Sequence, residues 1–287
     1  MPHFVDQLTE IIESQNLNEI IMNGVKGMLC IDPHKTTVQE FFSDQDPGDW
    51  LIQIQDFAWE MGEKLDPFKP FAGGIFKNRY RWHSIMPPLT DGGPVFSLRR
   101  HRFEELALSS FSMPSDTLKL LEQILAQGHS LMICGATGSG KTTLLHSLLK
   151  EFFSSSRVVI LEDVKELPVG YPLWIHLKSR PEQISGAPEI TLSQLLYESL
   201  RLHPQRMVIG EIRQKELLPF IEASATAHSG VLTTFHAGSM DDVRRRLSIL
   251  THNGGHRLFI NEEKSLWCLF LEGKEYRIRA LERFLSS

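Results

Sequence analysis

The sequence has few cysteines, no long apolar run and no excess of positive charge. Its three cysteines, Cys30, Cys134 and Cys268, are odd in number and far apart. That argues against a disulfide framework and a zinc site, and it favours a reducing compartment. No apolar run is long enough to span a bilayer, and the first residues lack the basic and apolar regions of a secretory signal. We therefore expect a cytoplasmic protein that reaches a membrane only peripherally, through partners.

Positive charge does not dominate either. Aspartate and glutamate number 35 against 30 lysines and arginines, for a net charge of −5. No global field attracts a nucleic-acid backbone, so we expect no direct nucleic-acid binding. The remaining composition, 41% hydrophobic and 23% charged over 287 residues, is that of an ordinary globular chain with room for two domains.

A glycine-rich loop is the most informative stretch. Residues 135–142 fit the pattern G-x-x-x-x-G-K-[ST], in which backbone N–H groups cradle phosphates, lysine reaches the outer phosphates and the hydroxyl holds Mg²⁺. An apolar run at 131–134 precedes it and leucines at helical spacing follow at 143–149, which predicts strand, loop and helix. The expected phosphate-binding residues are Gly135, Ala136, Thr137, Gly138, Ser139, Gly140, Lys141, Thr142 and Thr143, with Thr142 on Mg²⁺.

The second half of the chain alternates predicted strands and helices, which is typical of an α/β fold with a parallel sheet and crossover helices. Ser115 or Asp116 is expected to cap a helix that ends near Gly128, and Thr191 and Gln194 form a capping box. We predict strands at 157–161, 207–209 and 231–235, and a hairpin over 266–281.

The first hundred residues predict a mixed α+β domain with no catalytic motif of its own. Helical spacing is found at 4–12 and 50–61, whereas the Pro- and Gly-rich segment 65–74 cannot be helix interior. Strands are predicted at 18–24, 79–86 and 93–99. Residues 103–114 form a plausible connection between domains.

Acidic side chains follow two of the predicted strands. Glu162 and Asp163 come after one strand, and Glu211 follows Gly210 after another. Carboxylates at neighbouring strand ends could position the water and the metal that phosphate-loop hydrolases need. Since Gly210 stands where many such enzymes have aspartate, Glu211 is expected to contact Mg²⁺ through water. Taken alone, either carboxylate could instead cap a helix or lie in a solvated turn.

With these elements in order, the sequence resembles the secretion or traffic ATPases that power type II and type IV secretion and type IV and Tad pili. The likeness rests on the phosphate loop, the acidic box 160–167, an atypical Walker B segment at 200–213 and a histidine box at 226–237. Residues 19–24, 81–88 and 96–101 resemble the branch of type IV secretion and Tad-pilus motors.

This resemblance implies an architecture and partners. The fold would be a small α+β, PAS-like domain over residues 1–104, a linker at 105–114 and a RecA-like P-loop domain over 115–287. The family implies a ring-shaped homohexamer with nucleotide between the domains. It also implies platform or channel proteins in the inner membrane as partners. The resemblance does not say which secretion or pilus system is served.

The resemblance also implies roles for particular side chains. Glu162 would polarise the attacking water, and Glu211 would be the Walker B carboxylate. His228 and His236 would couple the γ-phosphate to neighbouring elements. Three arginines would stabilise the charge on the transferred phosphoryl group. Arg81 and Arg99 would do so from the N-terminal domain, and Arg213 would do so across a subunit interface.

Alternatives stay open. Without the family, His228 and His236 could be an ordinary loop and core histidine, and 99–102 a solvated edge. The run 244–246 after Asp241 and Asp242 is typical of an exposed helix with ion pairs at i,i+4. The protein could also be a nucleic-acid translocase, or a nucleotide-gated regulatory subunit with little hydrolysis, since Gln214 and Ala227 depart from the family pattern.

Overall fold

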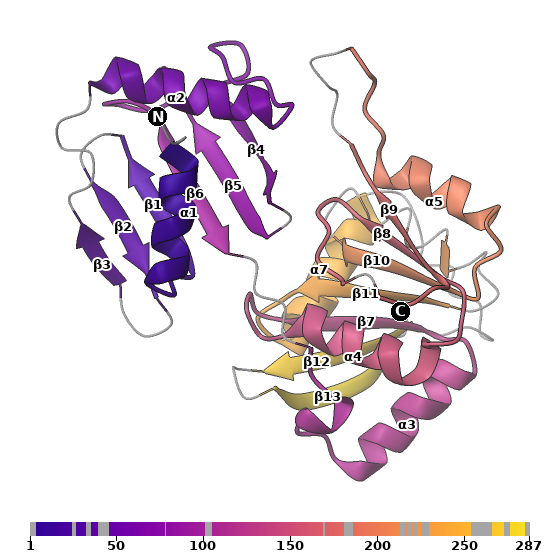
Figure 1. Cartoon of the computed structure of the whole chain (residues 1–287). Coiled ribbons are helices and arrows are strands. Elements are labelled where there is room, and N and C mark those ends of the chain that lie inside the picture. The colour runs from indigo at the N-terminus through magenta and orange to yellow at the C-terminus, as the bar shows by residue number, and fades with distance from the viewer. Residues whose placement is uncertain are drawn as a thin grey trace. The chain divides into compact units, whose positions relative to one another are not determined.

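The structure is a computed structural model. It describes residues 4–24, 27–32, 36–39, 46–77, 79–100, 105–168, 170–180, 186–212, 216, 220, 223–224, 230–253, 266–272 and 276–284. The chain forms two compact units, each drawn in Figure 1. The N-terminal unit comprises Met1–Arg102 with Pro181–Glu189, and the C-terminal unit comprises Phe103–Arg180 with Ile190–Ser287.

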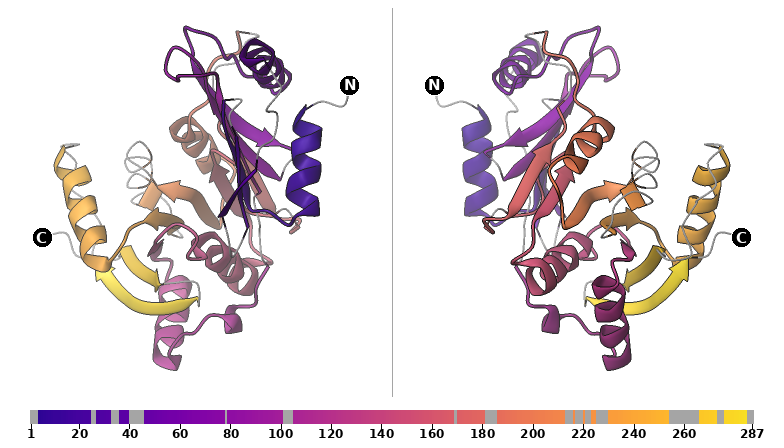
Figure 2. Two further views of the ribbon diagram at one scale, coloured as in Figure 1. Left: turned by 90° about the vertical axis from the view of Figure 1, so that its left-hand side faces the viewer. Right: turned by 90° about the vertical axis from the view of Figure 1, so that its right-hand side faces the viewer.

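The N-terminal unit is an antiparallel sheet with two helices. Its elements are α1 (Phe4–Ser14), β1 (Glu19–Asn23), β2 (Met28–Ile31), β3 (Thr36–Gln39), α2 (Pro47–Glu60), β4 (Phe71–Phe76), β5 (Tyr80–Ile85) and β6 (Val95–Arg100). The strand order is β3-β2-β1-β6-β5-β4. Helix α1 lies along one face of this sheet (Figure 2).

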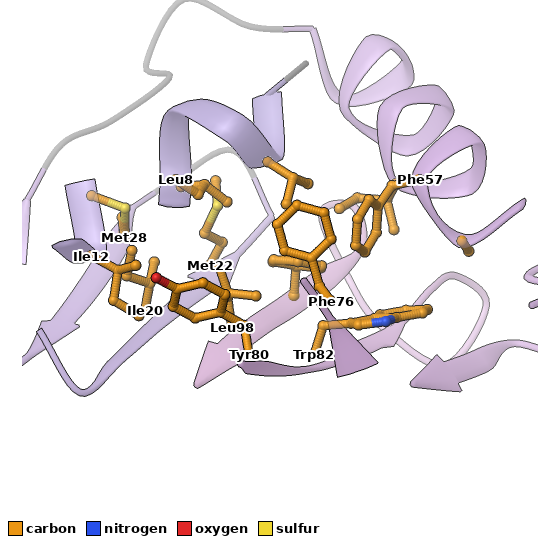
Figure 3. Packing of buried hydrophobic residues seen from close by; sticks show 14 of the residues in the cluster. Leu8, Ile12, Ile20, Met22, Met28, Phe57, Phe76, Tyr80, Trp82 and Leu98 are labelled. Carbon is orange, nitrogen blue, oxygen red and sulfur yellow. The ribbon is translucent and has the colours of Figure 1, made fainter. Parts of the chain in front are cut away.

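One face of this sheet is buried and the other is not. Alternate residues of several strands, such as Tyr80 and Trp82 in β5, join the core with Leu8 of α1 and Phe57 of α2 (Figure 3). Phe57 meets Trp82 edge-on, with ring centroids 5.0 Å apart. Because side chains alternate along a strand, the residues between them, including Arg81, point to the opposite face and are exposed.

The C-terminal unit is a mostly parallel sheet covered by helices. Its elements are a 3₁₀ turn (Leu108–Ser110), α3 (Ser115–Ala126), β7 (Ser130–Gly135), α4 (Lys141–Phe153), β8 (Val158–Glu162), β9 (Trp174–Lys178), α5 (Leu192–Leu200), β10 (Arg206–Ile212), β11 (Val231–His236), α7 (Met240–Asn253), β12 (Leu266–Glu272) and β13 (Arg277–Phe284). The strand order is β13-β12-β7-β11-β10-β8-β9. Only β13 runs antiparallel to its neighbour.

Helices cover both faces of this second sheet. Leucines of α3 and α4 pack in one core, and α5 and α7 contribute to another on the opposite side (Figure 1). Strands β7 and β8 are buried along their whole length, as expected of parallel strands with two covered faces. Among the described residues, no helix has the length and apolar character needed to cross a bilayer.

Most predicted elements are confirmed, including the phosphate-loop strand and helix, the capping box of α5 and the β12–β13 hairpin. The predicted cap of α3 was wrong. That helix begins at Ser115 itself, with Pro114 at the N-cap and no side-chain cap bond. In α7 the ion pairs are at i,i+3, Arg244 with Asp241 and Arg245 with Asp242.

Strands β2, β3, β4 and β9 were not predicted. Strand β4 lies in the Pro- and Gly-rich segment, where glycine normally weakens a strand. Here the glycines are required by the neighbouring strand, since a Cβ at Gly73 would lie 2.9 Å from the carbonyl oxygen of Trp82.

Candidate functional site

The glycine loop turns sharply between β7 and α4. Gly140 is the N-cap of α4 and has φ +90°, a conformation that L residues rarely adopt. At Gly135 a Cβ would lie 2.5 Å from the carbonyl oxygen of Leu271 in β12. The loop thus begins in close contact with β12 and presents the free N–H groups at the start of α4, which carry a partial positive charge.

Lys141, the first residue of α4, folds back on this loop. Its ammonium group donates to the carbonyl oxygen of Ala136 at 2.7 Å. Burial lowers the pKa of Lys141, and Glu211 is the largest of the charges that oppose this shift. This partly buried cation has a neutral carbonyl as its partner and no ion pair among the described residues, so it can bind a phosphate group.

Ser139 gives independent support for an anion at the loop. Its hydroxyl is buried, and within the described part of the chain its oxygen has no hydrogen-bond partner. A buried hydroxyl without a partner costs free energy, and a phosphate oxygen would accept its hydrogen bond. Helix α4 also starts without a side-chain cap. The loop residues therefore fit the phosphates of a nucleotide.

Thr142 is the residue expected to bind Mg²⁺. Its hydroxyl donates to Glu166, Oγ1 to Oε2 at 3.0 Å. The described residues contain no group of three or more histidines, cysteines or carboxylates arranged for a metal. A Mg²⁺ ion bound mainly by phosphate and water needs only one or two protein oxygens, and the hydroxyl of Thr142 can supply one of them.

Glu162 ends β8 and is buried. One carboxylate oxygen, Oε1, accepts the backbone N–H groups of Glu166 and Leu167, both at 3.0 Å. The other, Oε2, lies 3.4 Å from Nδ1 of His176 in β9. These contacts fix the orientation of the carboxylate, and only Oε2 is not already held by the backbone.

Glu211 lies near the end of β10, next to β8. A β-bulge separates Glu211 from Ile209, so Gly210 departs from the regular strand pairing. The carbonyl oxygen of Gly210 accepts a hydrogen bond from the hydroxyl of Thr234 at 2.7 Å. A Cβ at Gly210 would lie 3.1 Å from Cγ of Glu162. The glycine that replaces the usual aspartate is therefore in contact with Glu162. The parallel strands bring both acidic positions to one edge of the sheet.

His236 ends β11 beside the loop. Its Nδ1 lies 3.4 Å from Oγ1 of Thr137, and the next residue, Ala237, donates its N–H to the carbonyl of Gly135 at 3.2 Å. Its own carbonyl accepts from Arg246 of α7. The predicted site residue His236 therefore contacts the phosphate loop directly.

Arg81 and Arg99 belong to the N-terminal unit. They are Cα partners on β5 and β6 and both are exposed, on the face of the sheet opposite the helices. No hydrogen bond or ion pair joins either guanidinium to another residue in the described part of the chain. Two like charges placed opposite each other repel, whereas Glu19 of β1 lies opposite Arg99 on its other side and attracts it.

The structure thus brings together the phosphate loop, Glu162, Glu211 and His236. The predicted Arg213 and His228 lie outside the described residues. Sequence reasoning missed two contacts, Glu166 on Thr142 and His176 on Glu162. Glu166 could have been found from its place in the acidic box. His176 carried no signal, because strand β9 was not predicted.

The chain is similar to known proteins in sequence and in fold. Residues 80–259 match the family described as "Type II/IV secretion system protein". A protein of Mycobacterium tuberculosis provisionally named for conjugal transfer is 32% identical over 211 residues, 70% of this chain and 60% of its own length. The chain thus spans about three fifths of that relative.

Two solved structures show the same α/β fold. The ATPase DotB of Legionella pneumophila has a TM-score of 0.61 at 22% identity, covering 94% of this chain and 76% of its own. The pilus retraction motor PilT with bound ADP has a TM-score of 0.57 at 16% identity, covering 92% of this chain and 77% of its own. The predicted RecA-like fold is confirmed. The chain belongs to the family of type II/IV secretion system proteins.

Proposed function

We propose that this protein is a Mg²⁺-dependent ATPase that energises a secretion system or pilus assembly from the cytoplasmic side of the inner membrane. The observation that carries this proposal is the arrangement at one sheet edge, where a phosphate loop with a partly buried lysine lies beside two carboxylates. PilT, which shares the fold, is a pilus motor with ADP bound.

Each residue of the site has a distinct task. Lys141 would exchange the Ala136 carbonyl for phosphate oxygens, and Ser139 would donate the hydrogen bond that it lacks among the described residues. Bound Mg²⁺ would neutralise phosphate charge, with Thr142 as its protein ligand and Glu211 contacting it through water. Glu162 would accept the proton of the attacking water through Oε2, because Oε1 is occupied by two backbone donors.

Arginines would complete the site. Arg81 and Arg99 are exposed guanidinium groups on one sheet face, suited to charge that develops on a transferred phosphoryl group. We propose that Arg213 acts similarly across a subunit interface in a homohexamer, and that His228 and His236 sense the γ-phosphate. Turnover would then depend on domain closure. The alternation between open and closed domains would do mechanical work on inner-membrane platform or channel proteins.

The test is phosphate release by the full chain with ATP and Mg²⁺, compared with Lys141→Ala. Loss of the cation should lower turnover by about 100-fold or more. Lys119→Ala is the matched control, because Lys119 is exposed on α3. Wild-type turnover in Lys141→Ala would overturn the proposal. Tight ATP binding without turnover in the wild type would instead support a regulatory subunit. Turnover stimulated by DNA would support a nucleic-acid translocase.

A further inference from the structure

Residues 105–113, called here the strap, run along α4 toward the phosphate loop. The chain enters the C-terminal unit through this segment. Glu105 forms an ion pair with Lys150 at 2.5 Å, and the carbonyl of Leu106 accepts the hydroxyl of Ser147 at 2.7 Å. These partners lie in successive turns of α4, so the strap follows the helix back toward Lys141.

The far end of the strap is joined to Tyr276, which precedes β13. The N–H of Ser112 donates to the carbonyl of Tyr276 at 3.1 Å, and the N–H of Ile278 donates to the carbonyl of Ser112 at 3.0 Å. The Phe111 and Tyr276 rings lie 5.2 Å apart, and Phe111 is buried in the core below the sheet. The strap therefore holds Tyr276 by both backbone and side chain.

Tyr276 in turn lies against the phosphate loop. Its Cδ1 atom is 2.6 Å from the place that a Cβ at Gly140 would occupy. Gly140 is the N-cap of α4, and the next residue is Lys141. Tyr276 itself has φ +51°, a sparsely populated conformation for a non-glycine residue. The surrounding structure must hold it there, and the strap supplies that restraint.

We propose that Tyr276 is a positioning residue through which the strap and the phosphate loop are coupled. The ring fixes the start of α4, and the strap fixes the ring. Nucleotide that orders the loop would then tighten the strap, and release of the strap would weaken nucleotide binding. This reciprocity is required of any coupling between two sites. The inference rests on the proposed nucleotide site, and it adds a route by which nucleotide binding reaches the segment entering the unit.

The test combines ADP affinity with amide hydrogen exchange of the full chain, with and without saturating ADP and Mg²⁺. In the wild type, nucleotide should slow exchange at the Ser112 and Ile278 amides. In Tyr276→Ala, ADP should still bind, with a dissociation constant raised about fivefold or more, and this protection should be lost. Tyr276→Phe keeps the ring and should behave as the wild type.

Two further variants keep the test decisive. Ser112→Pro removes the N–H that donates to Tyr276 and loosens the strap without changing the ring, while the bond from Ile278 remains, so it should also weaken ADP binding. Tyr197→Ala deletes an exposed aromatic on α5, away from the strap, and should change neither quantity. The coupling is refuted if the wild-type protein binds ADP but amide exchange in the strap does not slow. It is also refuted if ADP slows that exchange equally in Tyr276→Ala. If wild-type protein binds no nucleotide, the proposed function fails instead.

Discussion

The chemistry of this protein depends on how individual carboxylates and cations are held. Glu162 is buried, and its Oε1 accepts two backbone N–H groups, which fix the orientation of the carboxylate. Lys141 is held by a carbonyl rather than a carboxylate. The proposed base is thus fixed by the backbone, whereas the lysine can exchange a neutral partner for phosphate.

Glu162→Gln should abolish turnover and spare binding. A glutamine oxygen can still accept both N–H groups, so the loop should fold, but an amide cannot accept a proton from water. We expect kcat to fall about 100-fold or more, with a nearly unchanged dissociation constant for ADP. Phosphate release and ADP titration measure the two quantities. Glu122→Gln on the exposed side of α3 is the control, and turnover at the wild-type level in Glu162→Gln would place the base elsewhere.

Arg99→Gln should lower activity without changing stability by much. Arg99 lies opposite Arg81 on β5 and opposite Glu19 on β1, so the repulsion and the attraction that are lost offset each other, and the free energy of unfolding should change by less than about 0.5 kcal/mol. The same change should lower kcat, because a guanidinium is lost from the proposed site. Urea unfolding and phosphate release measure the two quantities. A variant that is less stable but fully active would mean that Arg99 serves the sheet rather than the phosphates.

At the scale of elements, α5 depends on its cap. The side chain of Thr191 accepts the N–H of Gln194 at 3.2 Å, and Oε1 of Gln194 accepts the N–H of Thr191 at 2.8 Å. Both bonds satisfy donors at the helix start that would otherwise lack partners.

Thr191→Ala should therefore destabilise the C-terminal unit by about 1 kcal/mol. Urea unfolding followed by a probe of that unit measures the change. Thr191→Ser keeps the hydroxyl and should lose much less. An equal loss in both variants would mean that the threonine methyl group, not the hydrogen bond, is what stabilises the helix.

The sequence predicted elements whose patterns are local. The leucine periodicity of α4 and the capping box of α5 depend on nearby residues, and both are found as expected. Strand β4 could not be predicted, because its glycines are required by contact with Trp82 on another strand. The same limit applies within the site. The phosphate loop is contiguous in sequence, whereas the contact of His176 with Glu162 depends on the pairing of β9 with β8.

At the scale of the whole molecule, the residues of the proposed function come from two units. The phosphate loop and both carboxylates belong to one unit, and Arg81 and Arg99 belong to the other. The roles that we propose require residues of both units, which would make hydrolysis depend on conformation. Residues of a neighbouring subunit would extend the same dependence around a ring.

The most direct test of this account is light scattering with and without ATP and Mg²⁺, with phosphate release measured on the same samples of wild type and Glu211→Gln. We predict that the wild-type chain of 32.8 kDa forms a homohexamer that releases phosphate. Glu211→Gln should assemble equally well and release almost none. A wild-type protein that stays monomeric with nucleotide bound and releases no phosphate would contradict the account.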